Sequence, residues 1–201
     1  MKKFELTSET KINIFGKKLF RIKALVSFGV VKTGETGGWV EKEENVNQSG
    51  DAWVFGNAEV FGNARVSGDA RVFGNARVFG NAEVSDNAWV SGDAEVFGNA
   101  RVSGDAEVSD NAWVSGDAEV FGNAEVSGNA DYTTIHGFGT QFRTTTFFRC
   151  KDKQVKVSCG CFYGTIPEFR EQVKNTRDGK IAEEYLMIAD LMEKHFAEEA
   201  K

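Results

Sequence analysis

Residues 133–149, TTIHGFGTQFRTTTFFR, gather side chains suited to ligand binding. The two arginines carry forked guanidinium donors of the kind that bind phosphate or carboxylate groups, and the threonine hydroxyls add further hydrogen-bonding groups. Gly137 and Gly139 let backbone N–H groups approach an anion. The segment therefore predicts a site for a small anionic, nucleotide-like ligand, formed by His136, Arg143, Thr144, Thr145, Thr146 and Arg149.

The same segment has a second interpretation that needs no ligand. Threonine is common in strands, and both arginines have acidic residues of the preceding repeat available as partners. Residues 133–149 would then be a linker that caps the end of the repeat with hydroxyl hydrogen bonds. Both interpretations remain open from the residues alone.

Three cysteines follow, Cys150, Cys159 and Cys161. With His136 or His195 they offer the donor types of a zinc site. Their C-x8-C-x-C spacing matches no common zinc module, and cysteines in strands are usually small buried apolar residues. We therefore expect no metal and no cofactor, and we expect reduced thiols.

Composition limits the possible partners of this chain of 201 residues and net charge −6. No apolar run approaches the ~20 residues that cross a membrane, and the N-terminal MKKFELTSETKINIF lacks an apolar signal segment, which predicts a cytoplasmic protein. Between Asp51 and Asp131 there are fourteen acidic residues and only four arginines, and this negative charge argues against a nucleic-acid partner. Half of these acids lie at predicted turns, where Asp is favoured, so their number does not require mimicry of a nucleic acid.

A six-residue repeat occupies the middle of the chain. Valine recurs every six residues from Val54 to Val126, and alanine precedes each valine by two positions. Residues two apart in a strand face the same side, so each unit places one small and one medium apolar side chain inward. Gly-Asn or Gly-Asp then supplies a tight corner. This pattern predicts a parallel β-helix.

The residues just before the valines indicate three sides per coil. Three sides stack positions 18 apart, and one column then alternates in charge as Arg65, Glu83, Arg101, Glu119, with a second beginning Glu59, Arg77, Glu95. Two sides would instead stack Glu83, Glu95, Glu107 and Glu119. Alternating charges stabilise neighbouring strands and like charges destabilise them, so we predict three sides.

The repeat resembles the hexapeptide-repeat, left-handed β-helix superfamily over residues 39–132. Its opening, TGGWVEKEENVNQSGDAWV (residues 36–54), is similar to YdcK-type repeat proteins. The resemblance implies a left-handed coil. Acyltransferases of the superfamily use a histidine base and a loop that closes over acyl-CoA, whereas here no histidine precedes His136 and no loop interrupts the thirteen units. We therefore expect no catalytic residues, with an acyltransferase as an alternative.

Phenylalanine or serine follows each valine and should point outward. At 18-residue stacking, Phe55 and Phe73 share one face, while Phe61, Phe79 and Phe97 share the next. Such a patch is large for a monomer, so either the N-terminal segment or a second subunit should cover it. We expect these five residues to form the interface of a homo-oligomer, a dimer or a trimer. The alternative is that the stacked rings only stiffen the coil.

The flanking segments should close the two ends of the repeat. Residues 12–26 predict a hairpin around Gly16, and residues 147–162 predict another, turning at residues 151–153. A capping box at Thr165–Glu168 opens a helix to about Lys174, and a second helix runs from Ile181 to about Glu198. The motifs TTTFFR, CGCF and GTIPEF resemble the tails of uncharacterised phage and prophage proteins.

The predicted fold is an all-β solenoid. It is a left-handed three-sided parallel β-helix with an N-terminal β-hairpin cap and a C-terminal β-hairpin plus two α-helices. Its expected parts are residues 1–38, 39–132 and 133–201. The predicted function is a non-enzymatic, oligomeric scaffold or interaction protein encoded by a phage or prophage. A host protein is a further possible partner, and a counter-defence protein that sequesters a small anionic ligand is the alternative.

Overall fold

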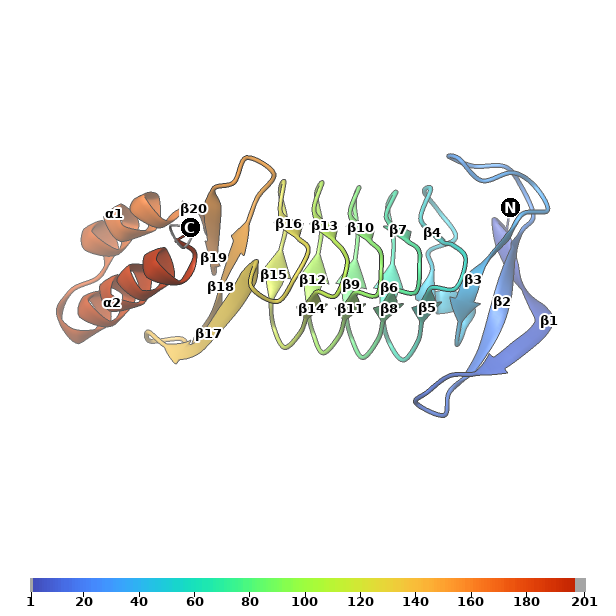
Figure 1. Cartoon of the computed structure of the whole chain (residues 1–201), viewed down its shortest axis with the longest axis horizontal. Coiled ribbons are helices and arrows are strands. Elements are labelled where there is room, and N and C mark those ends of the chain that lie inside the picture. The colour runs from blue at the N-terminus through green and yellow to red at the C-terminus, as the bar shows by residue number, and fades with distance from the viewer. Residues whose placement is uncertain (1, 198–201) are drawn as a thin grey trace.

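The hexapeptide units fold into two-residue strands joined by tight corners, stacked into an elongated rod (Figure 1). The structure is a computed structural model that describes residues 2–197. Its solenoid strands are β4 (Trp53–Val54), β5 (Glu59–Val60), β6 (Arg65–Val66), β7 (Arg71–Val72), β8 (Arg77–Val78), β9 (Glu83–Val84), β10 (Trp89–Val90), β11 (Glu95–Val96), β12 (Arg101–Val102), β13 (Glu107–Val108), β14 (Trp113–Val114), β15 (Glu119–Val120) and β16 (Glu125–Val126).

Each coil has three sides, as predicted from the charge columns. Strands pair in parallel with the strand three units further along, so the sheets run β5-β8-β11-β14, β4-β7-β10-β13-β16 and β6-β9-β12-β15. Glu83 pairs in register with Arg65 and Arg101. In the neighbouring sheet, Arg77 and Glu95 form an ion pair at 2.8 Å.

The interior of the solenoid is a column of valine and alanine. Every valine from Val54 to Val126 and every alanine from Ala52 to Ala124 is fully buried at six-residue spacing. Each buried valine contributes roughly 1.5–3 kcal/mol relative to an exposed one. Ala130 is exposed, however, so the regular inward pattern ends at Val126.

The corners require a left-handed backbone conformation, which explains the glycines. Gly92 has φ +65°, and a Cβ there would lie 2.7 Å from the backbone nitrogen of Asp110 in the next coil. Where aspartate replaces glycine, at Asp86 and Asp110, it adopts the same conformation with φ 57° and 51°. The Asn or Asp side chain after each corner residue lies above the one 18 positions later. The Asn99 amide, for example, donates to Asp117 at 2.9 Å.

The first coil is closed by the N-terminal segment. Strands β1 (Phe4–Ile12) and β2 (Lys18–Ala24) form the predicted hairpin, with β1 beginning earlier than expected, and β2 pairs with β3 (Thr36–Val40). The short helix η1 (Glu43–Asn45) follows, and β3 pairs in parallel with β5. The N-terminal cap therefore continues a sheet of the solenoid.

Most hydrogen bonds at the corners and strand ends run from one coil to the next, which makes the two ends chemically different. The N–H groups of Trp53 and Phe55, for example, donate to the carbonyls of Ala70 and Val72 in the following coil. Carbonyls at the equivalent positions of the first coil have no preceding coil to donate to them. The Lys3 ammonium donates to the carbonyls of Gly50 (3.1 Å) and Ala52 (2.9 Å), and the Asn45 amide caps two others, at Gly62 and Ala64.

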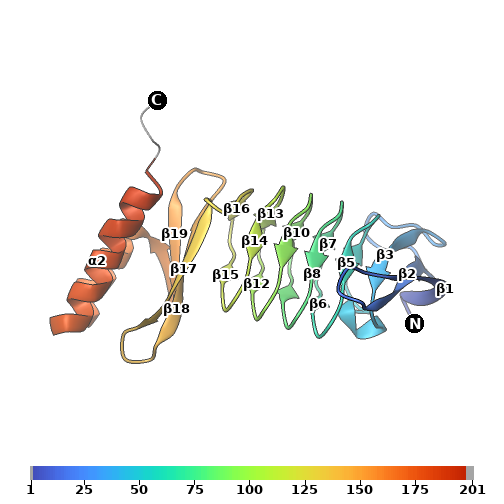
Figure 2. The same cartoon turned by 60° about the horizontal axis from the view of Figure 1, so that its bottom comes forward.

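The last coil is closed by a four-stranded antiparallel sheet, whose middle two strands form the predicted hairpin that turns at residues 151–153. Its strands are β17 (Tyr132–Phe138), β18 (Arg143–Arg149), β19 (Val155–Cys159) and β20 (Phe162–Thr165). The sheet lies across the end of the coils (Figure 2). Phe148 packs on the solenoid core, whereas its neighbour Phe147 packs under the helices, because successive strand residues face opposite sides.

Free N–H groups of the last coils find acceptors in and before this sheet. The Glu119 N–H donates to the Thr146 hydroxyl oxygen at 3.1 Å, and the Trp113 N–H donates to the Asn129 side chain at 2.8 Å.

Two helices cover the outer face of the C-terminal sheet. Helix α1 (Ile166–Thr176) begins at the predicted capping box, where the Thr165 N–H donates to Glu168. Helix α2 (Gly179–His195) begins two residues before Ile181, and the predicted end at Glu198 lies outside the described residues. Neither these helices nor any other among residues 2–197 is long and apolar enough to cross a membrane.

Candidate functional site

A cleft of about 620 Å³ lies between the last coil and the C-terminal sheet. We call it the junction cleft. One wall comes from the solenoid, at a corner and at β15. The other comes from β17, β18, the turn between them and the β19–β20 turn. Its main lining residues are Asp117, Glu119, His136, Phe142, Arg143 and Thr144.

The structure divides the predicted ligand-binding residues into two groups. His136, Arg143 and Thr144 lie together in the junction cleft, with the His136 Nδ1 and the Thr144 hydroxyl 3.1 Å apart. Thr145 and Thr146 are buried inside the cap, where the Thr145 hydroxyl donates to the sulfur of Cys159. The segment from 133 to 149 therefore forms both a cap and one wall of a cleft.

Arg149 also belongs to the cap. It lies 3.4 Å from Asp131 and donates to the carbonyl of Phe196 at 2.9 Å. These contacts tie β18 to the last turn of the solenoid and to the end of α2. Its guanidinium is thus already engaged within the chain.

The two carboxylates of the junction cleft were missed by our sequence analysis. Asp117 was assigned only to a corner and Glu119 only to a charge column. They line one cleft with His136 and Arg143 because the C-terminal sheet lies across the last coil, and no local sequence signal predicts that placement. A local motif search does not find the cleft, because the residues of its two walls are about one full coil apart in the sequence.

Aromatic side chains line two edges of the solenoid, and among them Trp89 and Trp113 are exposed. The rings of Phe61, Phe79 and Phe97 stack at centroid separations of 5.0 Å, and Trp113 meets Phe97 edge-on at 6.5 Å. Phe15 from the β1–β2 turn packs against Phe79 at 5.1 Å. We call Phe15, Phe79, Phe97 and Trp113 the aromatic stripe.

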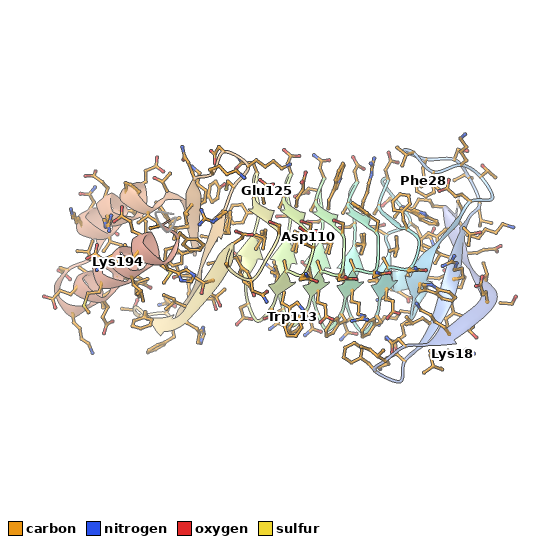
Figure 3. The ribbon with its side chains drawn as sticks, viewed as in Figure 1. Lys18, Phe28, Asp110, Trp113, Glu125 and Lys194 are labelled. Carbon is orange, nitrogen blue, oxygen red and sulfur yellow. The ribbon has the colours of Figure 1, made fainter. Side chains whose placement is uncertain are left out.

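The N-terminal cap covers only one end of this corner. Phe61 is 4% exposed because it packs with Leu19 and Trp39, so it contributes little accessible surface. Trp113 is 53% exposed. It lies on the lower edge of the rod in Figure 3, the same edge as Lys18 at the base of the β1–β2 turn.

The other phenylalanines occupy the remaining corners. Phe73 meets Trp89 edge-on at 6.1 Å, and both line a shallow cleft of about 330 Å³ with Phe55 and Val30. Phe121 packs against Tyr163 at 4.6 Å, under the C-terminal sheet. Phe61 and Phe121 therefore mark the places where the two caps rest on the solenoid.

The cysteines are dispersed within the C-terminal sheet. Cys150 is buried, which raises its pKa to about 11 and keeps it a neutral thiol, whereas Cys161 is exposed beside the junction cleft. Across residues 2–197, no three His, Cys, Asp or Glu side chains gather closely enough to hold a metal ion.

Comparison with known proteins supports the assignment of the repeat. Residues 70–83 match the family model of the YdcK beta solenoid repeat, and these residues include β7 and β8 of the stacked coils. This chain is a β-solenoid repeat protein. No curated protein matches it. Because the matched part of this β-solenoid repeat protein lies within the coils, the resemblance of its C-terminal segment to phage proteins stays a prediction.

Proposed function

We propose that this β-solenoid repeat protein is a non-enzymatic scaffold that assembles with a second copy of itself through the aromatic stripe. The observation that carries the proposal is the exposed end of the stripe, where Phe97 and Trp113 extend the stack beyond the N-terminal cap. Contiguous apolar patches of this kind are typical of interaction surfaces.

The aromatic stripe is a straight patch along the rod, so two identical rods can pack side by side through it. It follows a straight corner of the solenoid at the ~4.8 Å spacing of stacked strands, and the β1–β2 turn adds Phe15, which is 48% exposed. Two copies related by a two-fold axis bring the same patch against itself, which is the commonest arrangement in homo-oligomers. We therefore favour a dimer over a trimer.

The non-enzymatic part of the proposal rests on the chemistry of the coils. No histidine occurs before His136, so the solenoid offers no imidazole as a general base. His136 itself bonds to Thr144 on the C-terminal sheet, beyond the regular coils. An origin in a phage or prophage is proposed only from the C-terminal motifs.

Sedimentation of a double variant tests the assembly. Phe97→Ser places the residue that other units already carry at this corner, and Trp113→Arg places an arginine next to Glu95 in the register of the alternating column. We expect the wild type to sediment as a dimer at micromolar concentration and the folded double variant as a monomer.

The second aromatic corner supplies a matched control. Phe73→Ser with Trp89→Gln removes the two aromatic rings at the same 16-residue spacing, and glutamine avoids placing a second arginine beside Arg71. This variant should remain a dimer. A monomeric wild type, or equal dissociation of the two double variants, contradicts the proposed interface.

A further inference from the structure

The junction cleft holds opposite charges that do not neutralise one another. Asp117 and Glu119 line the solenoid wall, and Arg143 lines the facing wall. Within residues 2–197, Arg143 forms no ion pair with either carboxylate or with any other acidic side chain. A cleft with this separation suits a ligand that carries an anionic group at one end and N–H donors at the other.

The carboxylates retain acceptor capacity toward the cleft. Asp117 accepts one hydrogen bond from Asn99 through Oδ1, and Glu119 accepts one from Ser158 through Oε2. An ionised carboxylate has about four lone-pair sites, so each keeps sites for a ligand. Adjacent N–H donors such as N1–H and the N2 amino group of guanine match this pattern, whereas adenine places an acceptor beside its amino donor.

Phe142 supplies an aromatic surface at the mouth of the cleft. It is 65% exposed in the β17–β18 turn, and its φ of 48° lies in the left-handed region that bulky residues rarely adopt. Strained backbone of this kind concentrates at binding sites. Nucleobases stack on exposed aromatic rings, so Phe142 is suited to cover one face of a base.

Arg143 and His136 supply the anion-binding end. The guanidinium offers two parallel donors to a phosphate, and His136 lies on the neighbouring strand with Thr144 bonded to its Nδ1. A volume of about 620 Å³ lies within the ~300–1,000 Å³ range of small-molecule sites.

We propose that the junction cleft binds a guanine nucleotide. The base edge lies against Asp117 and Glu119, its face lies on Phe142, and the phosphate lies against Arg143 and His136. This site is separate from the aromatic stripe, so it does not depend on the proposed assembly.

Calorimetry on the whole chain tests the proposal with four probes: GMP, AMP, guanosine and inorganic phosphate. We expect GMP to bind at least ten-fold more tightly than each of the other three, because only GMP satisfies both walls. Arg143→Ala should lower GMP affinity to that of guanosine and leave guanosine unchanged. Asp117→Asn combined with Glu119→Gln should reduce the ratio of GMP affinity to AMP affinity.

Arg65→Ala is the matched control. Arg65 belongs to the same charge column as Glu119, at the opposite end of the solenoid, and its loss should leave GMP binding unchanged. Circular dichroism checks that each variant is folded. The proposal is overturned by the absence of GMP heat at millimolar concentration, by equal affinity for GMP and AMP, by phosphate binding as tight as that of GMP, or by unchanged GMP binding in folded Arg143→Ala.

Discussion

At the first coil of the solenoid, carbonyls such as that of Ala52 have no preceding coil to donate to them, and at the last coil N–H groups such as that of Glu119 have no following coil to accept from them. The N-terminal cap therefore supplies donors, from the Lys3 ammonium and the Asn45 amide. The C-terminal cap supplies acceptors, from the Thr146 hydroxyl and the Asn129 amide oxygen. The direction of one hydrogen-bond ladder thus decides which side chains each cap can use.

The two caps also differ in how they meet the coils. The N-terminal cap prolongs a solenoid sheet through β3, and its β1–β2 hairpin projects past the lower edge of the rod (Figure 1). The C-terminal sheet instead lies across the last coil (Figure 2). Each end has a cleft of similar volume, about 570 Å³ beside η1 and about 620 Å³ at the junction cleft. Of these two clefts, only the junction cleft combines carboxylates of the coils with side chains of a sheet laid across them.

The greatest loss of folding stability should follow from placing a charge in the valine-alanine column that connects the two ends. Val90→Asp buries a charge without a partner, at a cost of at least ~4 kcal/mol against a typical stability of ~5–15 kcal/mol. We expect loss of cooperative folding, measured by circular dichroism and urea titration. Ser91→Asp, one position further along, should fold, and a soluble, cooperatively folded Val90→Asp variant contradicts the inward register.

A smaller change in folding stability should come from Lys3 at the N-terminal end, and it should depend on pH. Burial lowers the pKa of Lys3 from 10.5 to about 8, so between these values the unfolded chain holds a proton that the folded chain has lost. Stability therefore rises with pH in this window, with a slope of up to about 1.4 kcal/mol per pH unit.

The measurement is the difference in unfolding free energy between wild type and Lys3→Met, from pH 8 to pH 10. Other groups titrate in both proteins and cancel in the difference, including Cys150, whose raised pKa acts in the opposite direction. The wild type should gain stability relative to Lys3→Met as the pH rises. A constant difference would mean that Lys3 is solvated rather than buried.

The smallest expected effect tests the acceptor end. Thr146→Val keeps the shape of the side chain but leaves the Glu119 N–H without its acceptor, which costs about 1 kcal/mol. Thr134→Val is the control, because Thr134 lies opposite Thr146 on β17 and is exposed. Urea unfolding should separate the two variants, and equal stabilities would show that the hydroxyl does not cap the coil.

Local rules account for most of the fold. The Val-Ala spacing determined which residues face inward, because strand geometry alternates them. Two charge columns determined the number of sides, because opposite charges alternate along them. In the third sheet Glu107 and Glu125 are neighbours, and Lys151 and Lys153 pair with them. The capping box likewise determined where α1 begins. Strand β17 was not predicted, because threonine-rich, glycine-containing segments are ambiguous between linker and strand.

The sequence by itself determined the coil, its three sides and its valine-alanine core, since each depends on residues a few positions apart or on a strict period. Only the tertiary structure decided which phenylalanines are covered, and it separated Arg143, in the cleft, from Arg149, in the cap. It also decided that Asp117 and Glu119 line one cleft with His136. These outcomes depend on where two irregular caps rest on a regular rod, and no periodic pattern specifies that position.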